Sequence, residues 1–282
     1  MTEPTTAEEA TTPGHRSGGG ALKGLIGMAV FLVAVLLLGA VLGFGPLAAP
    51  TPPAKVEDPR EMIARGLQAI LDSTSVHVDG TVTGSVPGAF INQGAEAITL
   101  DGMTVAADAR PKDATTQTHV VIPALDVALD TTSVWDALWY RTAPEEPWLR
   151  ASVGGVAADA GVDVNPLTLV DRLRAYLNRP DIVPTVSDAP CPDGSGTCRH
   201  IVLDAGSDPV TLLKVMLPDD TEAAIPPVST TVTVDSQVET LRPVRVSIDM
   251  VSDDGSIDVH LVLEPSRWDD PSITIEPPPT GS

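Results

Sequence analysis

The sequence predicts an α+β protein, in which helices cover the apolar face of an antiparallel β-sheet and one transmembrane helix precedes the whole. Three observations support this class. Alternating apolar and polar residues fill most of the chain after Pro59, three helix-start signals interrupt that alternation, and the 20 residues from Leu25 to Phe44 are all apolar or Gly. A sheet with one apolar face needs a second layer, which the helices would supply.

The apolar run is long enough to cross a membrane. No charge occurs between Lys23 and Lys55, and a helix rising about 1.5 Å per residue over this run spans roughly 30 Å, the thickness of a bilayer's hydrocarbon core. A cleaved signal peptide is the alternative, but its apolar region normally covers only about 7–15 residues. We therefore expect a disordered cytoplasmic tail over 1–22, a transmembrane helix over 23–45 and a Pro-rich linker over 46–58.

The charge balance bears on orientation and on partners. The formal net charge of -21 excludes a nucleic-acid binder that works through a basic surface. Lys and Arg on the two sides of the apolar run nearly balance, so the positive-inside rule does not decide the orientation. The strongly acidic part after the run favours a domain over 59–276 outside the inner membrane of the cell, followed by a short tail over 277–282.

The two cysteines predict a disulfide. Cys191 and Cys198 flank a Pro-, Asp- and Gly-rich turn across which both thiols can meet. A zinc site would require further ligands, and only His200 is near. A disulfide implies an oxidising compartment, which agrees with an extracytoplasmic domain.

Three segments carry helix signals. Asp58-Pro59, Asn165-Pro166 and Ser207-Asp208-Pro209 each supply an N-cap residue followed by Pro, and apolar residues at helical spacing follow each one. The clearest strand patterns cover 76–83, 121–130, 231–235, 244–250 and 257–264, with Asp253-Asp254-Gly255 as a hairpin turn between the last two.

No pattern indicates catalysis. The sequence has no His-Glu-x-x-His, Gly-x-Ser-x-Gly, Gly-x-Gly-x-x-Gly or phosphate-loop motif. His77, His119, His200 and His260 stand singly on strands, mostly at polar positions, where a solvated imidazole is the simplest interpretation. We expect a protein that is not an enzyme and that carries no metal or cofactor.

The apolar positions of the strands and helices are candidates for a ligand cavity. A gap between sheet and helices lined by such residues would suit an acyl chain, but a filled core produces the same alternation, so the pattern allows both. The candidate lining residues are Val121, Leu125, Val127, Leu169, Leu173, Leu213, Val232, Val234, Val244, Val246, Ile248, Val259 and Leu261.

Several segments resemble the LppX/LprAFG-type lipoproteins, relatives of the LolA/LolB fold. The segments that carry this resemblance are Met62–Val82, Val134–Arg141 with Trp148, Asn165–Val170, and the segments expected as closing strands, Val259–Leu263, Arg267–Pro271 and Ile273–Pro277. The resemblance covers nearly the whole domain. It lies in the order of the segments and their residue pattern, and no single motif is diagnostic.

This resemblance implies a curved antiparallel half-barrel with helices on its concave face, enclosing a cavity for the acyl chains of a lipid or glycolipid. It also implies a role in lipid transfer or handling in the cell envelope. The chain departs from the family because no lipidated Cys is present and the Leu25–Phe44 helix takes its place as the membrane anchor. The alternative is a non-catalytic envelope scaffold or sensor domain of the same fold that acts through protein contacts.

Overall fold

The computed structural model describes residues 58–88, 96–155, 179, 182–204 and 228–279. The predicted transmembrane helix and the two helices predicted after Asn165-Pro166 and Ser207-Asp208-Pro209 lie outside these residues. Within the described part of the chain, no helix combines the length and the apolar character needed to cross a membrane.

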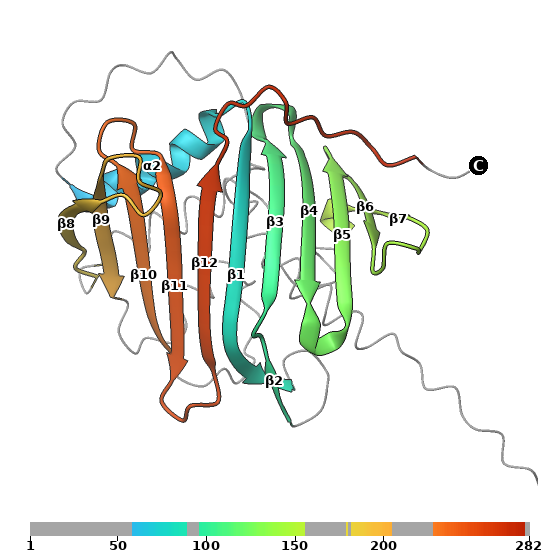
Figure 1. Cartoon of the computed structure of the whole chain (residues 1–282), viewed down its shortest axis with the longest axis horizontal. Coiled ribbons are helices and arrows are strands. Elements are labelled where there is room, and N and C mark those ends of the chain that lie inside the picture. Colours follow the sequence, from blue (N-terminus) through green and yellow to red (C-terminus); the bar gives the residue numbers. More distant parts are fainter. Residues whose placement is uncertain (1–57, 89–95, 156–178, 180–181, 205–227, 280–282) are drawn as a thin grey trace, which may run out of the picture.

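One antiparallel sheet dominates the described residues (Figure 1). Its strands are β1 (Val76–Pro87), β2 (Ala97–Thr99), β3 (Met103–Arg110), β4 (Thr115–Ile122), β5 (Val127–Val134), β6 (Ala137–Arg141), β7 (Leu149–Ser152), β8 (Thr185–Pro190), β9 (Thr197–Asp204), β10 (Val228–Gln237), β11 (Pro243–Ser252) and β12 (Asp258–Ser266). The order across the sheet is β7-β6-β5-β4-β3-β1-β12-β11-β10-β9-β8, and β2 pairs with β1. An antiparallel sheet with few helices is the predicted class.

The pairing of β1 with β12 joins the two halves of the sheet. β3 to β7 follow one another on one side of β1, and β8 to β11 lie beyond β12 on the other side. β1 bends at Gly84, where φ is +104°, and its end then pairs with β2. A Cβ at Gly84 would overlap the carbonyl oxygen of Asp258 on β12, so the close approach of β1 to β12 requires glycine here.

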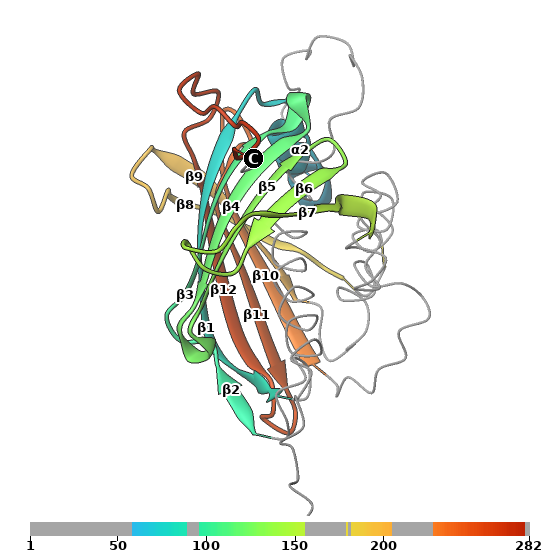
Figure 2. The same ribbon diagram turned by 90° about the vertical axis from the view of Figure 1, so that its right-hand side faces the viewer.

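Helix α2 (Pro59–Asp72) begins where the sequence predicts. The side chain of Asp58 caps it by accepting a hydrogen bond from the backbone N–H of Arg60, and Pro59 occupies the first helical position. The Arg60 guanidinium donates to the carbonyl oxygen of Ile182 at 2.7 Å, and at the other end of the helix Ile70 packs on β1 and β3. α2 therefore crosses one end of the sheet, and the strands curve around the side on which it lies (Figure 2).

The two faces of the sheet differ in chemistry. We call the face that α2 contacts the inner face, because Ile70 packs there against Val76 and Ala109. Inner-face residues of adjacent strands stand opposite one another in register, as Val82 does with Met103 and with Leu261. The alternate positions form the outer face, which carries the charged residues of the central strands.

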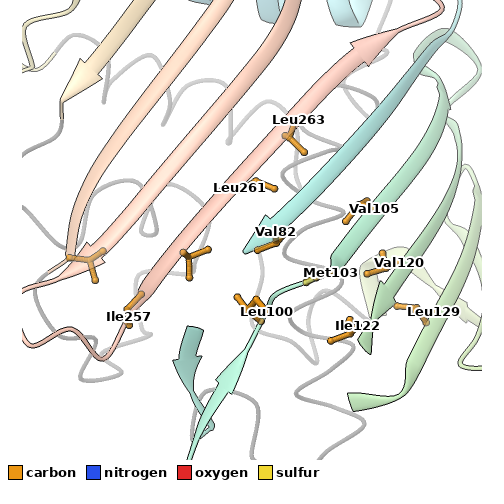
Figure 3. Packing of buried hydrophobic residues seen from close by; sticks show 12 residues of the cluster. Val82, Leu100, Met103, Val105, Val120, Ile122, Leu129, Ile257, Leu261 and Leu263 are labelled. Atoms are coloured by element: carbon orange, nitrogen blue, oxygen red, sulfur yellow. The ribbon is translucent and has the colours of Figure 1, made fainter. Parts of the chain in front are cut away.

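The main apolar cluster lies on the inner face and extends to the turns at one end of the sheet (Figure 3). Its buried members are Val82, Leu100, Met103, Val105, Val120, Ile122, Leu129, Val228, Ile257, Val259, Leu261 and Leu263. Val120 is 0% exposed between Val105 on β3 and Leu129 on β5, its register partners. The cluster thus extends continuously over both halves of the sheet.

The predicted disulfide is present. Cys191 and Cys198 are bonded across the turn between β8 and β9, with their Cα atoms 4.9 Å apart. The backbone N–H of Cys191 also donates to the carbonyl oxygen of Gly196 at 2.8 Å, which closes the turn. Both cysteines are buried against Val244, and the three form a small cluster of their own.

Two predicted strand segments are corrected. The alternation over 121–130 belongs to two strands, because the 3-10 turn η3 (Pro123–Leu125) separates β4 from β5 and Asp126 has φ of +52°. The closing segments Arg267–Pro271 and Ile273–Pro277 are not strands, since β12 ends at Ser266. Pro271 and Pro277 lack the N–H that a sheet ladder needs, and the segment instead runs across the strand ends (Figure 1).

Candidate ligand-binding face

The inner face offers a wide surface without charge. On β1, β3, β4, β5, β10, β11 and β12, no described inner-face position carries an ionisable side chain. Partly buried apolar side chains extend the main cluster toward both sides of the sheet. These side chains are Val78, Val86, Leu125, Val127, Tyr140, Val246, Ile248 and Met250. Such a surface favours an apolar partner, because removing apolar side chains from water lowers the free energy.

Hydroxyl groups are the polar exception on the inner face. Thr116 stands opposite Ser133, and Thr118 stands opposite Thr131, on the adjacent strands β4 and β5. All four residues are buried. The side-chain oxygens of Thr116 and Ser133 are 2.6 Å apart and share a hydrogen bond, whereas Oγ1 of Thr118 has no hydrogen-bond partner.

The outer face carries a series of cross-strand His–Asp pairs. Each of the four described histidines places Nδ1 within 2.6–2.8 Å of an Asp carboxylate that stands directly opposite on the next strand. The pairs are His77 with Asp108, His119 with Asp130, His200 with Asp235, and His260 with Asp249. These imidazoles are therefore hydrogen-bonded to carboxylates rather than the singly solvated groups expected from the sequence.

Two groups at the β11–β12 hairpin have shifted pKa values. The hydrogen bond that His260 donates to Asp249 raises the pKa of His260; burial lowers it by less, and the charges of Asp249 and Asp258 raise it further. In the turn, hydrogen bonds from the Ser256 and Ser252 side chains lower the pKa of Asp254 to about 2. Both shifts stabilise the charged forms at the hairpin, on the outer face and in the turn.

The described residues show no cluster of candidate metal ligands. Within them, no group of three or more His, Cys, Asp or Glu residues comes close enough to hold a metal ion. The histidines are engaged with carboxylates on the outer face, away from the uncharged inner face.

Most of the sequence-predicted lining residues that the structure describes share the inner face. Six belong to or pack against the main cluster, namely Leu125, Val127, Val246, Ile248, Val259 and Leu261. Val232 and Val234 lie beside them on β10, opposite Ile248 and Val246. Leu169, Leu173 and Leu213 lie outside the described residues.

Two of these residues have other positions. Val121 stands opposite Thr104 and Ala128, on the outer face, because the turn η3 shifts the alternation between β4 and β5. Val244 sits where the register between β10 and β11 shifts, and it packs against the disulfide instead of the main cluster. A register shift of one residue moves a side chain to different neighbours, and the local pattern does not reveal it.

The sequence analysis did not identify β3 or the hydroxyl group on β4 and β5. In β3, Met103 and Val105 alternate with polar residues, but Ala106 and Ala107 weaken the contrast. In β4, Thr116 and Thr118 occupy buried positions where the pattern would have placed apolar residues. The regular spacing of Thr116, Thr118 and Val120 was the available signal.

Comparison with known proteins gave matches only among solved structures. No family model matches the chain, and no curated protein does. The lipoprotein LppX of Mycobacterium tuberculosis is 18% identical and has a TM-score of 0.49, with 77% of this chain and 97% of that chain covered.

Two other solved structures match less well. An uncharacterized conserved protein from Thermus thermophilus gives 10% identity and a TM-score of 0.35, covering 73% of this chain and 85% of that one. A LolA superfamily protein from Nitrosomonas europaea gives 11% identity and a TM-score of 0.28, covering 73% of this chain and 90% of that one. Since all three TM-scores are below 0.5, the functional argument rests on the described residues.

Proposed function

We propose that this protein is anchored in the cell membrane and binds the acyl chains of a lipid or glycolipid against the inner face of its extracytoplasmic sheet. The observation that carries this proposal is the apolar inner face, which holds no ionisable side chain over seven strands while the outer face holds the His–Asp pairs. Removing apolar surface from water contributes about 25 cal/mol per Å², so a long acyl chain is a favourable occupant.

The anchor and the compartment belong to the same proposal. The Leu25–Phe44 run would hold the protein in the membrane, and the Cys191–Cys198 disulfide agrees with an oxidising compartment. A tethered protein reaches only as far as its linker allows, so we propose lipid transfer to a partner near the membrane rather than long-range transport.

Topology is tested with reporter fusions at Gly20 and after Ser282. A reporter that is active only outside the cytoplasm should work at the C-terminal position and fail at Gly20. The opposite result would reject the orientation. A mature form that begins near Ala49 would show that the apolar run is a cleaved signal peptide.

Lipid binding is tested by native mass spectrometry of the full-length chain purified from membranes. We expect an added mass that disappears on denaturation and that lipid extraction identifies as an acyl-chain compound. A chain that carries no lipid and takes up none from mixed lipid vesicles would contradict the proposal. That result would favour the alternative, an envelope scaffold or sensor domain with a filled core.

A further inference from the structure

Four hydroxyl residues interrupt the apolar inner face at one place. Thr116 and Thr118 on β4 face Ser133 and Thr131 on β5 in two successive inner-face pairs. The next inner-face pair along the same strands is Val120 with Leu129, which belongs to the main apolar cluster. The hydroxyl group is therefore continuous with the surface on which we place the acyl chains.

One of these hydroxyls is buried without a partner. Thr118 is 2% exposed, and its Oγ1 makes no hydrogen bond. Its register partner on β3 is Ala107, which has no polar side-chain atom. A buried hydroxyl without a partner destabilises the fold, and native proteins keep few of them, so this atom points to a bound group that the described residues do not supply.

The neighbouring pair has hydrogen-bonding capacity left. Thr116 and Ser133 each carry one O–H donor, and the single bond between them uses one of the two donors. Together with Thr118 and Thr131, the site can therefore offer three O–H donors and several acceptor lone pairs to a bound molecule.

The surroundings restrict the charge of that molecule. The inner-face positions of seven strands supply no cation to balance a phosphate or a carboxylate. Burying an unpaired ion is far more costly than burying a neutral polar group. A carbonyl or hydroxyl oxygen of an uncharged lipid matches the donors without this penalty.

We propose that Thr116, Thr118, Thr131 and Ser133 form a subsite that holds the uncharged oxygen-bearing group of the bound lipid, with Thr118 donating directly to it. The proposal rests on the lipid-binding function proposed above and adds its selectivity. Neutral glycerolipids bind with their ester or hydroxyl oxygens at the subsite and their chains along the partly buried side chains that border the main cluster, and anionic phospholipids are disfavoured.

Three probes separate the subsite from acyl-chain binding in general. Binding of dioleoylglycerol, dioleoylphosphatidylglycerol and squalane to the full-length chain in amphipol is measured by competition with a fluorescent acyl probe. Squalane has no oxygen, so it reports the apolar surface alone. We expect dioleoylglycerol to bind about tenfold or more tightly than the phospholipid, because the described inner-face positions of β1, β3, β4, β5, β10, β11 and β12 offer the phosphate no cation.

The decisive variant is Thr118→Val, which replaces the hydroxyl with a methyl group of similar size. It should weaken dioleoylglycerol binding about fivefold to tenfold, as expected for one lost hydrogen bond, and leave squalane binding unchanged. Thr118→Ser should restore dioleoylglycerol binding. Thr81→Val, at an exposed outer-face position, is the matched control and should change neither.

Stability provides an independent readout. The lipid-free Thr118→Val chain should melt no lower than the unaltered chain, since the change removes an unpartnered buried hydroxyl. A marked fall in its melting temperature would mean that the hydroxyl is bonded within the protein, and it would overturn the proposal. Equal loss of squalane and dioleoylglycerol binding would also overturn the proposal, because squalane has no oxygen and its loss would show that the substitution changed the shape of the surface.

The failure of the subsite and the failure of the function give different results. Unchanged dioleoylglycerol binding by Thr118→Val, in a chain that binds squalane, overturns the subsite and leaves lipid binding in place. If the unaltered chain binds none of the three probes, both the subsite and the lipid-binding function are overturned.

Discussion

A matched pair of Trp substitutions tests whether the inner face is packed or open along its length. Val120 and Val246 are both inner-face valines of central strands. Val120 is fully buried, between Val105 and Leu129, whereas Val246 is partly buried beside the main cluster. The lipid-binding proposal requires free volume next to Val246, whereas the 0% exposure of Val120 places it among side chains that already contact one another.

The expected free energies of unfolding differ for these two sites. Inserting extra methylene groups into a filled core costs about 1–3 kcal/mol, and Trp adds a whole indole ring in place of the two methyl groups of Val. Val120→Trp should therefore cost about 3 kcal/mol or more, which lowers the melting temperature of a domain of this size by at least about 6–12 °C. Val246→Trp should occupy the proposed cavity, cost less than about 1 kcal/mol and abolish lipid binding.

Thermal unfolding followed by circular dichroism, together with native mass spectrometry of bound lipid, measures both effects on the full-length chain. Ser247→Trp, on the outer face of the same strand, is the control and should leave lipid binding intact. If Val246→Trp unfolds the protein as severely as Val120→Trp, the face is filled at Val246 and the lipid-binding proposal fails.

Three further predictions concern the stability of the fold. Replacing Cys191 and Cys198 together by Ser should lower the free energy of unfolding by somewhat less than about 3 kcal/mol, because the closed loop is short; two free thiols in the exported protein would contradict this bond. Gly84→Ala should destabilise by about 3 kcal/mol or more, measured by urea denaturation, because its φ is positive and its Cβ would overlap a carbonyl oxygen; a stability within experimental error of the unaltered chain would refute the close strand approach. Asp249 raises the pKa of His260 above 6.5, so the pair's contribution to the free energy of unfolding is fully present below pH 6.5 and is lost as the pH rises through the folded-state pKa. His260→Gln should remove this part of the pH dependence of stability. An unchanged dependence of stability on pH would show that the pair does not form.

The His–Asp pairs show which long-range features the sequence could have revealed. Asp249 and His260 lie at equal distances from the Asp254-Gly255 turn, so pairing them follows from the predicted hairpin. By contrast, His77 and Asp108 pair between strands that are separated in the chain by β2. Without the strand order, no local pattern identifies that partner.

The candidate site divides in a similar way. The apolar inner positions of β11 and β12 could be predicted because the alternation there is regular and a recognisable turn joins the strands. Val121 and Val244 were assigned to the wrong surroundings because a 3-10 turn and a register shift each change the alternation. The Thr–Ser subsite was not predicted, since hydroxyl residues at inner positions have the composition of an outer face.

The sequence by itself determined the start of α2, the disulfide turn, the hairpin at Asp254 and the antiparallel class. Each of these depends on residues within a few positions of one another, which set caps, turns and alternation directly. The tertiary structure alone decided that β1 pairs with β12, so that His77 stands opposite Ser266 and the two halves share one inner face. That choice depends on how the whole sheet closes its backbone hydrogen bonds and buries its apolar side chains, and these energies belong to strand pairs far apart in the chain.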